Sequence, residues 1–287
     1  MSTITPVGPE RTSPGFLAER RDGPFDLETA YQAAEAVIAA EAIDPRKLGK
    51  PYHDIDVMAD MQKVRDCKTQ FAKDDERTKK ARKLSKILEV AIHQQVNAGW
   101  FGRSTRAVLP SEFDDYVNKV DLITEFGVKD SPAKAHAALG IDVTYGDDLT
   151  AKIHKILEQI DKGVLSTVMY YKSPDGRFVG SLNHVPRVIV GMDEASAGII
   201  ARAWYQGNPA LKTDPLREKV IIEIIDECEA FERYAIAKGR PEVAESYRYM
   251  REIFEKIYGD SVTPEDRKQF ANDKVLQRIE LIINQLK

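Results

Sequence analysis

The segment LGIDVTY, residues 139–145, decides how the middle of this chain folds. Its apolar and β-branched side chains are typical of a buried strand, yet a carboxylate, Asp142, stands at its centre. Burying an unpaired carboxylate costs several kcal/mol, so Asp142 must be paired with a cation, neutralised or bound to a metal ion. The function of this strand therefore depends on what surrounds Asp142.

The segments around Asp142 predict a mixed α/β core over residues 76–192. Before it stand the helical ARKLSKILEVAIHQQV and two strand-like segments, STRAVLP and KVDLITEF. After it stand the amphipathic helix DDLTAKIHKILEQIDKG and two further strands, LSTVMYY and PRVIVGM. The predicted order is helix, three strands, helix and two strands.

The flanks of this core are predicted to be helical. Residues 1–25 are rich in Pro, Gly, Ser and Thr, which predicts a disordered or loosely docked arm. Residues 26–75 predict N-terminal helices, the first of them capped by Asp26. Residues 193–287 predict a helical region, in which the apolar face of PLREKVIIEIIDECEAFERYAIAKG must be covered by the core or by a second subunit.

Composition narrows the class of protein. The net charge of −4 argues against a surface coated with positive charge, although a local basic groove is compatible with it. The chain has two cysteines and no CxxC pattern, no apolar run long enough for a membrane span and no signal-peptide core. The GxSxG, Walker A and GxGxxG motifs are missing from the sequence. These features predict a cytoplasmic protein with no membrane segment.

Three acids stand in an order that carries chemical meaning. Glu89 lies in the helix before the strands, Asp121 in the strand segment KVDLI and Asp142 in GIDVT. This order resembles the PD-(D/E)XK nuclease superfamily, in which an αβββαβ core places an Asp on one strand and (D/E)xK on the next. The resemblance covers about residues 76–192 and implies a restriction-endonuclease-like core.

The resemblance implies a role for each of these residues. Asp121 and Asp142 would hold Mg²⁺ or Mn²⁺ together with the backbone carbonyl of Val143, and Glu89 would assist. Carboxylates that converge from adjacent strands make a hard oxygen site suited to Mg²⁺. An ion there can polarise a phosphoryl group and activate a water. Asp142 would then be tolerated because a cation neutralises it.

The sequence departs from the family pattern at Thr144, which stands where the family has its lysine. Threonine has no charge to offer a transition state, and losing one such preorganised group reduces the rate by about 10²–10³. Lys152 on the following helix is the first candidate to replace that lysine; Lys155 and Lys172 are weaker candidates. Alternatively, the site binds without catalysing.

The stretch SEFDDYVNKVD before the second strand reads as a loop. An exposed turn with Asx capping explains its acids, while a functional interpretation has Asp115 or Asn118 orienting a metal-bound water. The two interpretations remain open.

A nucleic-acid substrate requires local positive charge, and the sequence concentrates it between residues 77 and 106. A solvated helix face explains any single one of these residues, but the cluster as a whole favours contact with phosphate. The candidate nucleic-acid-binding residues are Lys79, Lys83, Lys86, Arg103 and Arg106.

The sequence therefore favours an enzyme: an Mg²⁺-dependent nuclease acting on phosphodiester bonds of DNA, or with less support RNA, and working as a homodimer through its C-terminal helices. The alternative is an inactive nuclease-fold module that binds nucleic acid or a protein partner, which Thr144 favours. A helical scaffold protein with an α/β insert is the third interpretation.

Overall fold

The computed structural model describes residues 25–127, 136–145, 149–213, 215–259, 262–268 and 270–285. The elements in this part of the chain are, in order, α1 (Leu27–Glu41), the 3₁₀ turn η1 (Pro45–Lys47), α2 (Asp54–Phe71), α3 (Glu76–Asn97), β1 (Thr105–Val108), α4 (Glu112–Tyr116), β2 (Leu122–Gly127), β3 (His136–Tyr145), α5 (Leu149–Asp161), β4 (Ser166–Lys172), β5 (Val179–Val185), β6 (Arg187–Met192), α6 (Glu194–Tyr205), η3 (Pro209–Thr213), α7 (Leu216–Ala237), α8 (Pro241–Tyr258), α9 (Pro264–Lys268) and α10 (Lys274–Asn284).

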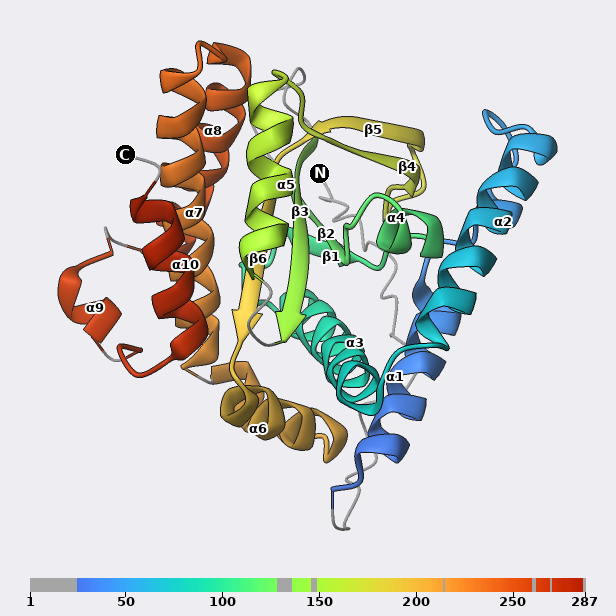
Figure 1. Ribbon diagram of the computed structural model, residues 1–287, viewed down its shortest axis with the longest axis horizontal. Helices are drawn as coiled ribbons and strands as arrows, with labels where there is room; N and C mark the ends of the chain where they lie inside the picture. Colours follow the sequence, from blue (N-terminus) through green and yellow to red (C-terminus); the bar gives the residue numbers. More distant parts are fainter. Residues whose placement is uncertain are drawn as a thin grey trace, which may run out of the picture.

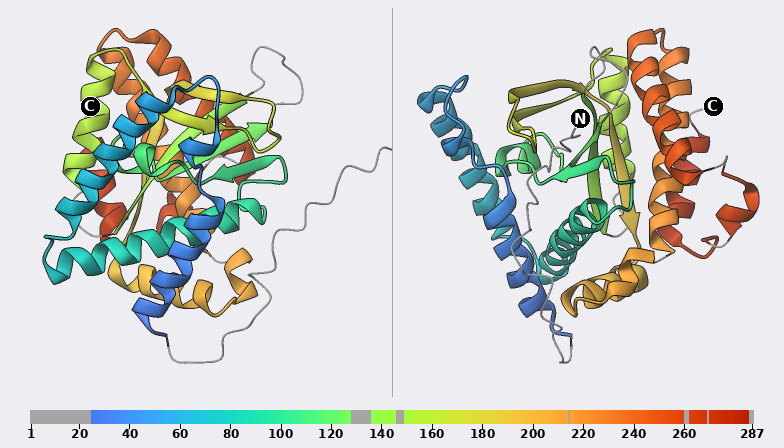
Figure 2. Two further views of the ribbon diagram at one scale, coloured as in Figure 1. Left: turned by 90° about the vertical axis from the view of Figure 1, so that its right-hand side faces the viewer. Right: turned by 180° about the vertical axis from the view of Figure 1, so that it is seen from behind.

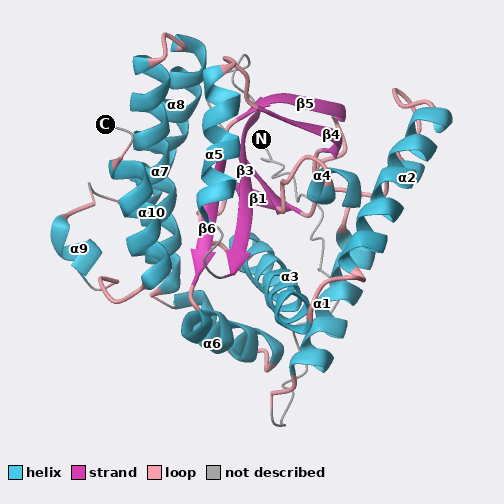
Figure 3. Cartoon of the chain, in the orientation of Figure 1, coloured by secondary structure: helices cyan, strands magenta, loops and turns pink. Residues whose placement is uncertain are grey.

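A four-stranded mixed sheet in the order β1-β2-β3-β6 forms the centre of the molecule. The first three strands are antiparallel neighbours, and β6 pairs in parallel with β3, so that Asp142 lies in register with Ile189. Strands β4 and β5 pair only with each other among the described residues and form a separate two-stranded sheet. Figure 3 shows the strands gathered at the centre with helices around them.

Helices cover the sheet from two sides. Helix α3 lies against β1 and β3, while α5, α7 and α10 lie against β6. Helices α1 and α6 pack on α3 and extend its layer (Figure 1). Seen from behind in Figure 2, α7, α8 and α10 form a wall on one side of the strands and α1 and α2 stand on the other. The fold is thus mixed α/β, as the sequence predicts.

Side chains of the C-terminal helices seal the outer edge of β6. Tyr247 donates its hydroxyl to the carbonyl of Arg187 at 3.2 Å, and Glu227 accepts from the N–H of Ile189 at 2.8 Å. The ammonium of Lys219 donates to the carbonyl of Gly191 at 2.8 Å. An open sheet edge invites pairing with another chain, so these contacts satisfy the edge within the molecule.

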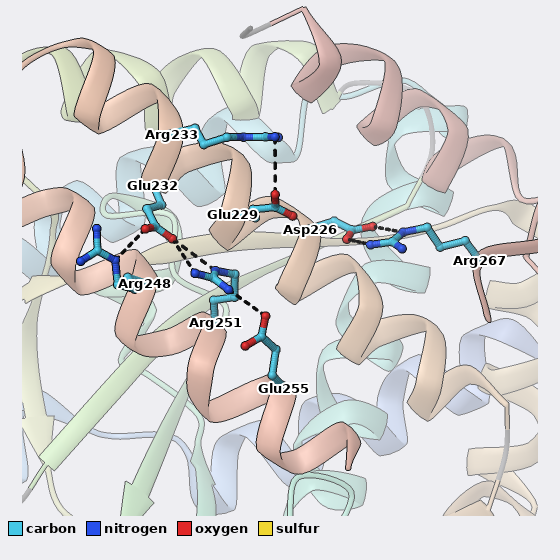
Figure 4. A network of polar contacts seen from close by, with 8 residues as sticks. All are labelled: Asp226, Glu229, Glu232, Arg233, Arg248, Arg251, Glu255 and Arg267. Atoms are coloured by element: carbon cyan, nitrogen blue, oxygen red, sulfur yellow. Dashed lines mark hydrogen bonds and ion pairs between the residues drawn. The ribbon is translucent and has the colours of Figure 1, made fainter. Parts of the chain in front are cut away.

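The apolar face of α7 is covered by the same chain. Ile221, Ile224 and Phe231 are all buried there, in the core shared with the sheet and α8. Between α7 and α8, Glu232 accepts from Arg248 at 2.7 Å and contacts Arg251 at 3.1 Å (Figure 4). Of the two covers that the sequence allows for this face, the core of the same subunit is the one observed.

Most predicted elements are confirmed, with three differences. Strand β5 is missed by the sequence analysis, and the predicted loop over residues 111–121 contains the short helix α4. The last predicted helix is divided into α9 and α10, because the carboxylate of Asp273 caps a new helix by accepting from the N–H groups of Val275 and Leu276. Asp26 caps α1 as predicted, while residues 1–24 of the predicted arm lie outside the described residues.

Among the described residues, none of the helices combines the length and the apolar character that crossing a membrane requires.

Candidate functional site

Asp121 and Asp142 meet where β2 begins beside β3. The antiparallel ladder ends with Leu122 paired to Ile141, so Asp121 directly precedes the last paired residue of β2 and Asp142 directly follows its partner in β3. The N–H of Asp121 donates to the carbonyl of Ile141 at 3.1 Å, and its carboxylate accepts from the N–H of Val143 at 2.9 Å. The two acids therefore share one end of the sheet.

Burial is the main reason that both acids have raised pKa values. Burial, followed by the charge of Asp115, raises the pKa of Asp121 from the usual 3.8 to about 6. Burial, followed by the charge of Asp121, raises the pKa of Asp142 to about 6 as well. Each carboxylate thus ionises less readily because it is desolvated and another acid is near.

Two further acids join Asp121 from the other layer. Glu89 projects from α3 and is 4% exposed, while Asp115 comes from the short helix α4. Carboxylate oxygens of Glu89, Asp115 and Asp121 all lie within 4.8 Å of one another. Burial, opposed by Lys86, raises the pKa of Glu89 well above its ordinary value. We call these three residues the acid triad.

Two lysines neutralise part of this negative charge. The ammonium of Lys86 lies 2.7 Å from Glu89 Oε2 and also contacts the carboxylate of Asp115. The ammonium of Lys152, which is 31% exposed and comes from α5, lies 2.5 Å from Asp142 Oδ1. Four carboxylates therefore face two ammonium groups.

Arg187 supports the same end of the sheet from β6. Its guanidinium donates to the carbonyls of Asn118 and Lys119, at 3.2 and 3.0 Å. These hydrogen bonds hold the segment before β2 against β6. The positive charge of Arg187 also lowers the pKa of Asp142, against the effect of burial. Within the described part of the chain, Arg187 Nε finds no hydrogen-bond acceptor although the residue is 4% exposed.

The donors of the acid triad fit a divalent cation of the Mg²⁺ type. All are carboxylate oxygens, which Mg²⁺ and Mn²⁺ prefer, and they come from three separate elements. The ammonium of Lys86 already rests on two of the three carboxylates, so this cluster accepts a positive charge. Asp142 does not belong to the triad and contacts Lys152 instead.

The remaining residues of the predicted site fall into three groups. Val143 and Thr144 are buried on β3, beside Asp142. Lys155 and Lys172, the weaker candidates for the missing lysine, are both exposed. Asn118, a candidate for orienting water, donates its side-chain amide to Asp114 at 2.7 Å and not to the triad.

The predicted nucleic-acid-binding residues divide between surface and interior. Lys86 is 7% exposed and lies inside the site, so it is not part of an exposed basic face. Lys79 and Lys83 are partly exposed and pair with Glu76 at 3.0 Å and with Glu28 at 2.5 Å, respectively. Arg103 and Arg106 are exposed.

The sequence leaves the role of Asp115 open and does not predict that Lys86 belongs to the site. Lys86 precedes Glu89 by three residues, a spacing at which two side chains of one helix can meet, and this spacing is the one sequence signal for their contact. The pattern S-x-x-D in SEFD also signals the helix cap that positions Asp115: Ser111 accepts from the N–H of Asp114 at 3.1 Å.

Comparison of the chain with protein-family models, with curated proteins and with solved structures finds no match.

Proposed function

We propose that this protein is an Mg²⁺- or Mn²⁺-dependent nuclease that hydrolyses phosphodiester bonds of DNA, with RNA the less favoured substrate. The observation that carries the proposal is the convergence of carboxylates where β2 begins beside β3. Asp121 and Asp142 flank the last pair of this ladder, while Glu89 and Asp115 bring further carboxylates to Asp121. Such a convergence of acids from separate elements suits a metal-assisted hydrolysis.

The order of elements supports the resemblance to the PD-(D/E)XK superfamily. Helix α3, strands β1, β2 and β3, helix α5 and strand β6 follow the αβββαβ order, with the short helix α4 inserted after β1 and the β4–β5 hairpin before the last strand. Glu89 and Asp142 stand on the elements that the resemblance assigns to the family acids, and Asp121 directly precedes its strand, β2. The resemblance therefore rests on topology as well as on the motif.

Each residue has a proposed task. When bound, the ion supplies Lewis-acid polarisation of a phosphoryl oxygen and lowers the pKa of a neighbouring water. Asp121 and Glu89 hold it, with Asp115 and Asp142 completing the oxygen set. Because Val143 turns its N–H toward Asp121, its carbonyl is expected on that same side of β3, available as a further ligand.

Lys152 is the proposed replacement for the family lysine, whose position in the motif is occupied by Thr144. Its ammonium lies 2.5 Å from Asp142, so it stands beside the proposed metal ligands. It is also partly exposed, which lets it reach a phosphate that arrives from solvent. A fixed ammonium at this point stabilises negative charge that develops on the phosphoryl group.

An inactive nuclease-fold module is the second candidate, and the lysines favour it. Lys86 and Lys152 already neutralise Glu89, Asp115 and Asp142, so the acids can persist in the fold without a metal. Such a module would bind nucleic acid or a protein partner without cutting.

For the nucleic-acid contact we propose the exposed side chains of Arg103 and Arg106, with Lys79 and Lys83 on α3. Cutting both strands of a duplex favours a homodimer with paired sites. Ile236 on α7 and Leu281 on α10 are exposed apolar residues of the C-terminal helices that support such an interface.

The test is a cleavage assay on supercoiled plasmid and single-stranded DNA, with Mg²⁺, Mn²⁺ or EDTA. The proposal expects metal-dependent cutting that Asp121→Asn and Asp142→Asn abolish. Glu245→Gln, which removes an exposed acid of α8, is the control and should cut like the wild type. DNA binding without cutting in either metal would support the inactive module and contradict the nuclease.

A further inference from the structure

Lys86 sits where a divalent ion would have to bind. Its ammonium contacts Glu89 and Asp115, which are two of the three residues of the acid triad. The Lys86 side chain is 9% exposed, so it is held inside the cluster and is not a passing surface contact. A metal ion at this position would be coordinated by these oxygens. It would therefore compete with the Lys86 ammonium for the same lone pairs.

We propose that Lys86 is a displaceable internal counter-ion of the metal site. In the metal-free protein its ammonium holds Glu89 and Asp115 together, and a divalent ion must push it off these carboxylates to bind. Lys86 thereby sets the metal affinity, because the site is open to the ion only in the fraction of molecules whose ammonium has moved away. This inference rests on the metal site of the proposed function.

A neighbour of Lys86 can keep contact with its ammonium after displacement. The ammonium already lies over the ring of Tyr116, 5.5 Å from the ring centroid, within the range of a cation–π contact. Because the lysine side chain is long and flexible, this contact can persist when the ammonium leaves the carboxylates. Displacement therefore does not require the ammonium to remain buried without a partner.

Lys80 provides a control on the same helix. It carries the same charge on α3, but its ammonium lies 3.2 Å from Glu194, which lies outside the acid triad and the proposed oxygen set. Removing either lysine changes the net charge of the protein by the same amount. Only removal of Lys86 empties the place between Glu89 and Asp115.

The experiment is a calorimetric titration of the metal-free full-length protein with Mn²⁺ at constant pH. We compare the wild type with Lys86→Met and Lys80→Met. We expect Lys86→Met to bind Mn²⁺ about tenfold more tightly or better. Lys80→Met should stay within about threefold of the wild type, because it removes only a longer-range and screened repulsion.

A second variant and a second measurement guard against misfolding. Lys86→Gln keeps a hydrogen-bond donor but no charge, and it should also bind Mn²⁺ more tightly. In EDTA, Lys86→Met should melt several degrees below the wild type, since it leaves buried carboxylates uncompensated, and Mn²⁺ should restore the loss.

Equal gains from Lys86→Met and Lys80→Met would overturn the inference in favour of net charge alone. Weaker binding by both Lys86 variants would overturn it too, because Lys86 would then organise the site. If none of the proteins binds Mn²⁺, the inference and the metal-dependent nuclease both fail. If Mn²⁺ binds as expected but DNA is not cut, only the nuclease proposal fails.

Discussion

Asp142 is buried and Asp121 is half-buried, without a complete set of counter-charges. Lys152 pairs with Asp142, and the carboxylate of Asp121 accepts from the N–H of Val143. Both pKa values nevertheless rise to about 6, since desolvation and a nearby acid, Asp115 for Asp121 and Asp121 for Asp142, outweigh these contacts. Such a pair of acids is held in the fold at a cost to stability, which is what a functional site often shows.

The raised pKa of Asp142 predicts a pH dependence of stability in the absence of metal. Its pKa is 3.8 ordinarily and about 6 when folded, so the native state binds more protons than the unfolded state between these values. The contribution to stability is therefore present below pH 3.8 and is lost as the pH rises through 6. It amounts to about 3 kcal/mol.

Urea denaturation in EDTA at a series of pH values measures this contribution. Asp142→Asn removes the titrating group, so its free energy of unfolding should fall less than that of the wild type between pH 4.5 and 7, a window that spans about half of the expected titration. If the free energy of unfolding changes equally with pH in the two proteins, Asp142 does not titrate in this range.

Lys152 allows a prediction about catalysis with a neighbour as its control. If its ammonium replaces the missing motif lysine, Lys152→Ala should lower kcat for DNA cleavage by about 10²–10³. Lys155 lies on the same helix and is exposed, and Lys155→Ala should leave kcat within about twofold, as for an ordinary surface substitution. Single-turnover cleavage rates decide the matter, and an equal loss in both variants would rule out a specific role for Lys152.

At the residue scale the sequence indicates which acids converge but not which lysines pair with them. Asp121 and Asp142 are recognisable because each interrupts an apolar strand segment. Lys86 belongs to a run of basic residues that resembles a solvated helix face, and only the packing of α4 against this region buries it. Burial by a distant segment leaves no trace in the local pattern of a helix.

At the scale of elements, the closest approach is that of helix α10 to strand β6. A Cβ atom placed on Gly191 would lie 2.2 Å from Cγ1 of Val275, at the start of α10. Only glycine lets the helix approach the strand this closely. The docking of α10 therefore depends on Gly191.

Gly191→Ala should reduce the free energy of unfolding by about 1–3 kcal/mol, the usual effect of overpacking a core. The double variant Gly191→Ala with Val275→Ala should recover part of the loss, because the second change removes the clashing methyl group. Gly198→Ala in α6 is the control, since nothing lies within 4 Å of its added Cβ, and it should be neutral or slightly stabilising. Urea denaturation compares them, and an unchanged stability for Gly191→Ala would contradict the close docking.

The elements that the sequence predicts are those with a strong period or a clear cap. The amphipathic helix α5 and the apolar strands β3 and β6 are examples. Strand β5 escapes prediction because its sequence, VGSLNHV, mixes Gly, Ser and Asn with few β-branched residues. It is fixed by hairpin pairing with β4, across the connection of residues 173–178, rather than by its own propensity.

For the whole molecule, the site joins layers that are otherwise separate. Glu89 belongs to the α3 layer, Asp121 and Asp142 to the sheet, and Lys152 to the α5 layer. A ligand that bridges these layers stabilises the folded state alone. Metal binding is therefore expected to be visible in the stability of the entire fold.

Mn²⁺ at about one hundred times its dissociation constant should add about 2.7 kcal/mol and raise the Tm by roughly 5 °C or more. EDTA should reverse the shift, and Asp121→Asn should reduce it strongly. Differential scanning calorimetry measures the Tm with Mn²⁺, with EDTA and for Asp121→Asn. A Tm that does not change with Mn²⁺ would indicate that the acids only stabilise the fold.

At this scale the sequence predicts the order of the core elements but not how the C-terminal helices complete it. The apolar face of α7 is evident in the sequence, yet both the core and a second subunit could cover it. The choice depends on Glu227, Lys219 and Tyr247, whose polar groups match the free edge of β6. A match of this kind arises only in three dimensions.

The central claim is that the carboxylates at the meeting point of β2, β3 and α3 hold a divalent ion. The most direct measurement is a crystal of the protein soaked in Mn²⁺, with an anomalous difference map. We predict a peak within about 2.5 Å of carboxylate oxygens of Glu89 and Asp121, with the ammonium of Lys86 moved away from Glu89. A map without a peak at this position, and with Lys86 still seated between Glu89 and Asp115, would contradict the account.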